Sequence, residues 1–184
     1  SADELLKKLR DESEKNKDDT RKLLEELRRR AEKNKKDIED LLREIEKKLR
    51  EVLEDIKRKV RDEEKLRRLK EMLERILKRA RELVEELKKE NDKILKELED
   101  MVEDDKRDNK RIIERVEELR KKVRDEEEVK RAVDEVRRLL EESHKKSREV
   151  IKRIKKLLED SHKKVREIVT ELDKLIKEVE KKVE

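Results

Sequence analysis

The sequence predicts an all-α protein, an antiparallel three-helix bundle of long, nearly straight helices of about 60 residues each. Three observations lead to this fold. Glycine and proline are absent, apolar residues recur at spacings of three and four, and the apolar stripe changes direction twice along the chain. A composition of 62% charged and 30% hydrophobic residues, without aromatics, is typical of long helices and coiled coils. Disorder is the competing interpretation of so polar a chain, and the regular apolar spacing argues against it.

An eighteen-residue repeat accounts for the straightness. It is written three times from Leu5 to Arg58, as LLKKLRDESEKNKDDTRK, LLEELRRRAEKNKKDIED and LLREIEKKLREVLEDIKR. Eighteen residues make about five turns at ~3.6 residues per turn, so Leu5, Leu23 and Leu41 return to the same side of a helix. A seven-residue repeat imposes left-handed supercoiling and an eleven-residue repeat right-handed supercoiling. A stripe that closes every eighteen residues therefore predicts almost no supercoil.

The first predicted helix covers residues 2–60. Ser1 and Glu4 have the spacing of a capping box, in which the two side chains satisfy amides at the start of a helix. The stripe of this helix keeps one phase throughout. Its members are Leu5, Leu6, Leu9, Ser13, Asn16, Thr20, Leu24, Leu27, Ala31, Asn34, Ile38, Leu42, Ile45, Leu49, Val52 and Val60.

Two jumps in phase mark the predicted turns. After Val60 the stripe points about 110° away from its earlier direction, and a jump of about half a turn follows Val123. Both jumps fall on nearly the same sequence, KVRDEEKLRR and KVRDEEEVKR. Asp62 and Asp125 are predicted N-caps, followed by glutamates that complement the positive end of the helix dipole. Asp125 and Glu128 also have capping-box spacing.

These turns predict further helices over residues 64–123 and 127–183, in a single domain of residues 1–184. Short connections force neighbouring helices to run antiparallel. The eighteen-residue period persists in the last helix, where LLEESHKKSREVI and LLEDSHKKVREIV are near copies. The same geometry is therefore expected in all three helices.

Polar residues interrupt the stripe at places that the pairing of helices would bring together. If the turns centre near residues 62 and 125, residues of the first two helices face each other when their numbers sum to about 125. For the last two helices the sum is about 251. Two predicted layers result. The first contains Asn34, Asn91, Ser161 and His162, and the second contains Asn16, Asn109, Ser143 and His144. Four more polar residues lie near the second layer, namely Ser13, Thr20, Asp105 and Ser147.

We interpret these layers as buried, hydrogen-bonded groups that set the register of the helices. Each unsatisfied polar group inside an apolar core costs roughly 1 to 3 kcal/mol, and only one alignment places asparagine opposite asparagine. The alternative is that these side chains line a loose, hydrated groove.

Catalytic and metal-binding patterns are weak in this sequence. Glu141 with His144, and Glu159 with His162, have the Glu-x-x-His spacing of di-iron bundles. The two pairs lie about 27 Å apart along one helix, and both glutamates face away from the apolar stripe. There is no cysteine and no glycine-rich phosphate loop, and the serines lack a convergent base. We predict no enzyme activity, no metal and no cofactor.

The charge pattern argues against nucleic acid and membranes. Sixty Lys and Arg against 55 Asp and Glu leave a formal charge of +5, with both signs interleaved. Basic clusters such as Arg28, Arg29 and Arg30 lack the stacking aromatics of nucleic-acid sites. No apolar run exceeds two residues, so neither a membrane span nor a signal peptide is expected. A soluble, cytoplasmic protein is the expectation.

The repeats, the glycine-free turns, the surface of alternating acids and bases and the polar layers together resemble computationally designed bundles built from parametric coiled-coil geometry. The closest resemblance is to the monomeric, antiparallel, untwisted three-helix type, although designed turns usually contain glycine. The resemblance implies a hyperstable scaffold with no biochemical activity and no partner. The alternative is a coiled-coil interaction or spacer protein that binds other chains through its stripe. The two phase jumps favour the scaffold, because a continuous rod has no reason to rotate its stripe.

Overall fold

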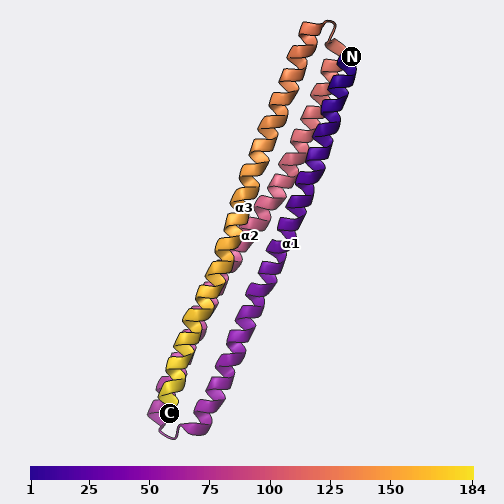
Figure 1. The fold of residues 1–184 in the computed structure, drawn as a ribbon. Coiled ribbons are helices and arrows are strands. Elements are labelled where there is room, and N and C mark those ends of the chain that lie inside the picture. Colours follow the sequence, from indigo (N-terminus) through magenta and orange to yellow (C-terminus); the bar gives the residue numbers. More distant parts are fainter. The chain divides into compact units, whose positions relative to one another are not determined.

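The computed structural model describes residues 1–184, which form three α-helices joined by two short connections (Figure 1). α1 is Ala2–Lys59, α2 is Glu63–Lys122 and α3 is Glu126–Val183. The helices pack against one another as a bundle, and no strand is present. The predicted all-α three-helix fold is confirmed, and each helix begins and ends within one residue of the bounds expected from the sequence.

Side-chain caps explain where the helices begin. The hydroxyl of Ser1 accepts the amide of Glu4 at 3.4 Å, and Asp62 Oδ1 accepts the amide of Glu64 at 3.0 Å. Asp125 Oδ1 accepts the amide of Glu128 at 2.8 Å. The Glu128 carboxylate accepts the amide of Arg124 at 2.8 Å, one residue before the amide that a regular capping box uses. These bonds satisfy amides that have no partner within the helix.

The connections need no glycine, and the backbone shows why. No residue has a positive φ angle, so neither connection uses the left-handed conformation that favours glycine at many helix ends. Each helix has acidic residues in its first turn and basic residues in its last turn. These charges complement the helix dipole at both ends.

The chain divides into two compact units, and each contains a segment of all three helices. Unit 1 comprises Ser1–Arg29 and Leu95–Lys156, and it includes the connection between α2 and α3. Unit 2 comprises Arg30–Ile94 and Leu157–Glu184, and it includes the connection between α1 and α2. The expectation of a single domain over residues 1–184 stays a prediction.

Within unit 1, ion pairs between helices show in which direction α2 runs. As residue numbers rise along α1, the partners on α2 fall in number: Asp3 pairs with Arg120, Arg10 with Glu117 and Lys17 with Asp105. The same holds along α3, where Glu135 pairs with Arg115, Lys146 with Asp104 and Arg153 with Glu97. In this unit α2 therefore runs antiparallel to both α1 and α3.

In unit 2 the same order holds for α2 and α3. Lys164 of α3 pairs with Glu90 of α2 at 2.8 Å, and Glu171, seven residues further along α3, pairs with Arg79 at 3.7 Å. The core of this unit is continuous and apolar, and it draws on residues 38–60, 69–87 and 168–179. The separate core of unit 1 contains Leu6, Leu9 and the buried apolar residues of 112–119 and 132–140.

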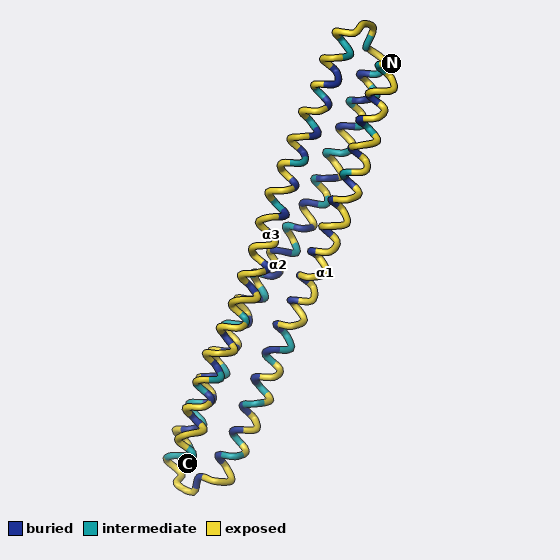
Figure 2. Tube along the Cα trace, viewed as in Figure 1, coloured by how far each residue is buried: buried dark blue, intermediate teal, exposed yellow.

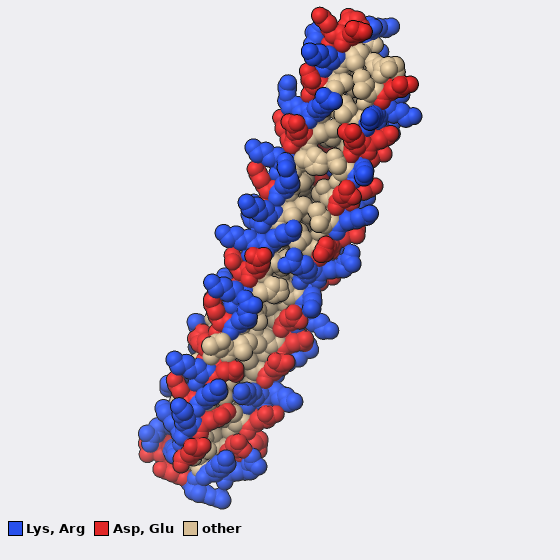
Figure 3. Space-filling view, in the orientation of Figure 1, with Lys and Arg blue, Asp and Glu red and all other residues tan.

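Burial follows one side of each helix, as Figure 2 shows by the dark blue bands that recur along every tube. Acidic and basic side chains are intermixed over the face drawn in Figure 3, with uncharged side chains visible between them. A helix that buries only a stripe and keeps its other sides charged is the arrangement that the spacing of three and four predicts. None of the helices is apolar over a stretch long enough to cross a membrane.

Candidate functional site

Three buried polar residues of unit 2, one from each helix, form a cluster that we call the asparagine layer: Asn34 of α1, Asn91 of α2 and Ser161 of α3. Asn34 Nδ2 donates to Asn91 Oδ1 at 3.0 Å and to Ser161 Oγ at 2.9 Å. Asn91 Nδ2 donates to the backbone oxygen of Ala31 at 2.9 Å. No member of the layer is more than 1% exposed. The layer therefore ties all three helices together by hydrogen bonds inside the protein.

The hydrogen bonds of the layer depend on the alignment of the helices. A shift of α2 by one turn would move Asn91 by about 5.4 Å along the helix axis and break its bonds to Asn34 and Ala31. The amide groups would then be left in an environment that buried apolar residues such as Ile38 and Leu87 dominate. Even in the aligned state, the buried Asn34 Oδ1 accepts no hydrogen bond from protein, which costs roughly 1 to 3 kcal/mol.

His162 does not belong to the asparagine layer, which corrects the assignment made from the sequence. Its side chain is exposed, whereas that of Ser161 is 1% exposed. Consecutive residues of a helix are separated by about 100° around its axis. With Ser161 directed into the bundle, His162 is turned toward solvent.

A second cluster lies in unit 1, and a buried ion pair is at its centre. Lys17 Nζ of α1 donates to Asp105 Oδ1 of α2 at 2.8 Å, and the two side chains are 8% and 6% exposed. Lys17 also donates to the hydroxyl of Ser143 on α3. Ser143 Oγ in turn donates to Asp108 Oδ2 at 3.4 Å. We call Lys17, Asp105 and Ser143 the lysine cluster.

The lysine cluster differs from the second predicted layer, which placed Asn16 and Asn109 at its centre. Asn16 is half-buried, and Lys17 holds the buried position beside it. Asn109 is also half-buried and accepts a hydrogen bond from Ser13 Oγ at 3.5 Å, at the edge of the cluster. His144 is half-buried, while its neighbour Ser143 is buried. Of the four predicted residues, only Ser143 contacts the centre.

The sequence analysis did not predict that Lys17 is buried. The spacing of the stripe could not distinguish Lys17 from Asn16, because both positions fit it. Ser13, Lys17, Thr20 and Leu24 are separated by four, three and four residues, and all four are buried. A lysine in such a position is usually taken as solvent-exposed, since lysines are almost never fully buried unless paired. The signal that could have identified it is Asp105, an acid in the stripe of α2 at the matching height.

Two opposing effects determine how much the lysine cluster contributes to the free energy of unfolding. Removing an ammonium and a carboxylate from water is costly, and their attraction at 2.8 Å offsets that cost only when the geometry is good. Such a pair adds little net stability, but removing one partner leaves a buried unpaired charge. Like the asparagine layer, the cluster therefore penalises misalignment more than it stabilises the correct alignment.

The contact between Ser143 and Lys17 has the chemistry of a nucleophile next to a base, but the site lacks the rest of an acyl-transfer centre. Ser143 and Lys17 are both buried, so a substrate has little access to either. Both residues lie in helix interiors, where the backbone amides bond within the helix and supply no oxyanion-hole donors.

The two Glu-x-x-His pairs do not converge on a metal site. Glu141 and Glu159 are exposed, while His144 is half-buried and His162 is exposed. No group of three or more His, Cys, Asp or Glu side chains is arranged to hold a metal ion.

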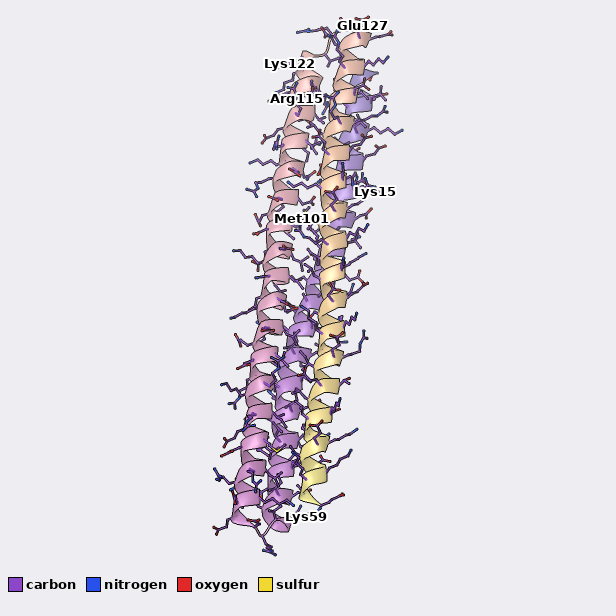
Figure 4. All side chains as sticks on the ribbon, turned by 90° about the vertical axis from the view of Figure 1, so that its left-hand side faces the viewer. Lys15, Lys59, Met101, Arg115, Lys122 and Glu127 are labelled. Carbon is purple, nitrogen blue, oxygen red and sulfur yellow. The ribbon has the colours of Figure 1, made fainter.

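Hydrogen-bonded ion pairs also join the helices at their partly exposed borders. Arg115, labelled on α2 in Figure 4, binds Glu135 of α3 through two bonds of 2.7 and 3.1 Å. These hydrogen bonds, with the positive charge of Arg115, lower the pKa of Glu135. Arg120 makes the same kind of two-bond contact with Asp3, and that contact lowers the pKa of Asp3. The bond from Lys164 to Glu90 raises the pKa of Lys164.

Comparisons of the chain with known protein families, with curated proteins and with solved structures give no match.

Proposed function

We propose that this protein is a de novo designed structural scaffold, a hyperstable monomer whose helices are aligned by buried polar residues and which has no biochemical activity of its own. The observation that carries the proposal is the asparagine layer, in which Asn34 contacts both Asn91 and Ser161 at 3.0 Å or less. Each helix contributes one polar residue at a matching height. An arrangement of this kind specifies an alignment and offers no surface to a ligand.

The way in which the apolar stripes are used supports a protein that needs no partner. Within each unit, the buried apolar residues of all three helices pack against one another. Only four large hydrophobic residues are exposed, namely Leu5, Leu23, Leu157 and Val169. Single exposed apolar residues are normal on soluble proteins. A stable interface, by comparison, buries about 800 Å² per partner, much more than single exposed residues supply.

The regularity of the sequence supports a designed origin. The chain combines an eighteen-residue repeat with the absence of glycine, proline, cysteine and aromatic residues. Its helices are capped by side chains at their N-terminal ends and carry charges that complement the dipole at both ends, which is the practice recommended for designed helices. Strong helix formers fill the surface positions.

Two measurements test the proposal. Light scattering during size-exclusion chromatography is expected to give a mass near 22.6 kDa over a wide range of protein concentrations. Circular dichroism is expected to show a guanidinium midpoint above about 5 M, the range of hyperstable proteins. A mass that rises with concentration, or a midpoint typical of ordinary domains, would contradict the proposal.

A second candidate function is an interaction or spacer protein, and one observation favours it. Leu5 is 48% exposed and Leu23 is 42% exposed on α1, and the eighteen-residue spacing places them on the same side of that helix. If this side binds another chain, replacing both leucines by lysine will lower a measured dimer mass to that of the monomer. If the scaffold proposal is correct, the same substitutions will leave the mass unchanged.

A further inference from the structure

A groove between α1 and α2 in unit 2 has an apolar floor. Leu49 and Leu53 of α1 and Leu73 and Leu77 of α2 line it, and its volume is about 310 Å³. Leu49 and Leu73 are buried, while Leu53 and Leu77 are half-buried. This volume lies at the lower end of the range for small-molecule sites, about 300 to 1,000 Å³. The groove thus offers apolar surface that no other helix covers.

The groove is elongated along the helices. Its α1 wall includes residues 46, 50, 53 and 57, and its α2 wall includes residues 70, 74, 77 and 81. Each set follows the spacing of four, three and four that keeps residues on one side of a helix. Eleven residues of helix span about 16 Å, so the groove fits a narrow, extended apolar ligand better than a compact one.

The border of the groove is predominantly cationic. Arg50, Lys57, Lys70 and Arg81 line it, against two carboxylates, Glu46 and Glu74. Arg50, Lys70 and Arg81 make no ion pair or hydrogen bond with another side chain, and Lys57 has only an exposed contact of 3.8 Å with Glu54. Three of the four cations are therefore available to an incoming anion.

A groove between α2 and α3 in the same unit has the opposite charge. It is lined by Leu83, Leu87 and Ile168 together with four glutamates and one lysine. That lysine, Lys164, already binds Glu90 at 2.8 Å. The cationic border is thus a property of the groove between α1 and α2, and it is not shared by every apolar groove of the bundle.

We propose that the groove between α1 and α2 binds a free medium-chain carboxylate, with the hydrocarbon chain on the four leucines and the carboxylate on the border cations. The floor supplies a narrow apolar surface that would be dehydrated by the chain. Arg50 and Arg81 present planar guanidinium groups that can hold a carboxylate through two hydrogen bonds. This ligand combines the two properties that the groove presents, an extended apolar lining and an excess of positive charge. The binding is separate from the proposed scaffold function, and the failure of either proposal leaves the other unaffected.

Isothermal titration calorimetry with dodecanoate, at concentrations below its micelle formation, tests the proposal on the full chain. We expect one dodecanoate per chain. The double substitution Lys70→Glu and Arg81→Glu is expected to weaken binding at least tenfold, because it reverses two border charges. The control is Lys174→Glu with Lys177→Glu, which makes the same change of charge at exposed positions of α3. We expect that control to bind within twofold of the parent.

A second pair of variants tests the floor. Leu53→Asn with Leu77→Asn replaces the two half-buried leucines and is expected to weaken dodecanoate binding at least tenfold. Thermal unfolding of each variant shows whether it is folded. If the asparagine variant is not folded, the charge variants still test the proposal, because their substitutions lie at exposed and half-buried positions. Binding that is absent in the parent, or equal in the parent and the Lys70→Glu, Arg81→Glu protein, would overturn the proposal. Equal weakening by the α3 control would overturn it as well, since it would indicate attraction to overall charge.

Discussion

Lys17 and Asp105 form an ion pair of 2.8 Å between α1 and α2, with side chains that are 8% and 6% exposed. In a protein with 62% charged residues, nearly every other charge lies at the surface, where ion pairs contribute little. This pair is different because water does not screen it. The stability of the lysine cluster should therefore respond sharply to the loss of one partner.

Replacing Lys17 by alanine is expected to lower the free energy of unfolding by about 3 to 5 kcal/mol, because Asp105 would remain buried without its partner. Replacing both residues by apolar ones of similar size, Lys17→Met with Asp105→Leu, is expected to be neutral or to stabilise by about 1 to 4 kcal/mol. Guanidinium unfolding followed by circular dichroism measures both. A loss below about 1 kcal/mol for Lys17→Ala, the value of an exposed pair, would show that the cluster is hydrated.

The asparagine layer is expected to determine alignment more than stability. Replacing Asn34 and Asn91 together by leucine should keep or raise the free energy of unfolding, because the buried Asn34 Oδ1 without a partner disappears with them. The uniqueness of the fold should decline, visible as extra sets of amide signals in NMR spectra. The single substitution Asn91→Leu removes the acceptor of Asn34 and should cost roughly 1 to 3 kcal/mol. A large loss of stability in the double variant would argue against a role in alignment.

The bond between Arg115 and Glu135 predicts a dependence of stability on acid pH. Since the pKa of Glu135 is lowered in the folded protein, the unfolded chain binds more protons between the two pKa values. The contribution of this bond is fully present above the unfolded pKa of glutamate, about 4.3, and it is lost as the pH falls through the lowered value. We expect Glu135→Gln to flatten the fall in unfolding free energy below about pH 4.3.

The matched control for that measurement is Glu141→Gln, which changes an exposed glutamate of the same helix. Its profile should follow that of the parent. If the Glu135→Gln and Glu141→Gln proteins lose stability in parallel as the pH falls, the bond to Arg115 does not contribute in solution.

The hydrogen bond that caps the start of α3 is expected to contribute to the stability of the protein. Asp125→Ala removes the acceptor for the Glu128 amide at 2.8 Å and should lower the free energy of unfolding by about 0.5 to 2 kcal/mol. Asp125→Asn should behave almost as the parent, because asparagine caps about as well as aspartate. Denaturant unfolding of both variants checks this. Equal losses for alanine and asparagine would mean that the carboxylate acts through its charge and not as a hydrogen-bond acceptor.

The sequence alone determined the helices and where they end, because those properties are local. The phase jumps after Val60 and Val123 and the capping aspartates Asp62 and Asp125 lie within the residues that form the turns. Two short turns and helices of nearly equal length also led to Asn34 opposite Asn91, the pair that the structure places at 3.0 Å.

Only the tertiary structure decided which residues of unit 1 form the buried polar cluster. Asn16 and Lys17 are consecutive residues, about 100° apart around the helix, and either fits a stripe with spacings of three and four. Lys17 is buried because Asp105 and Ser143 lie at its height and bond its ammonium group, and no property of α1 by itself reveals those partners. The exposure of His162 and the opposite charges of the two grooves in unit 2 likewise depend on how neighbouring helices are rotated against each other. That rotation is set by side-chain packing between segments far apart in the chain.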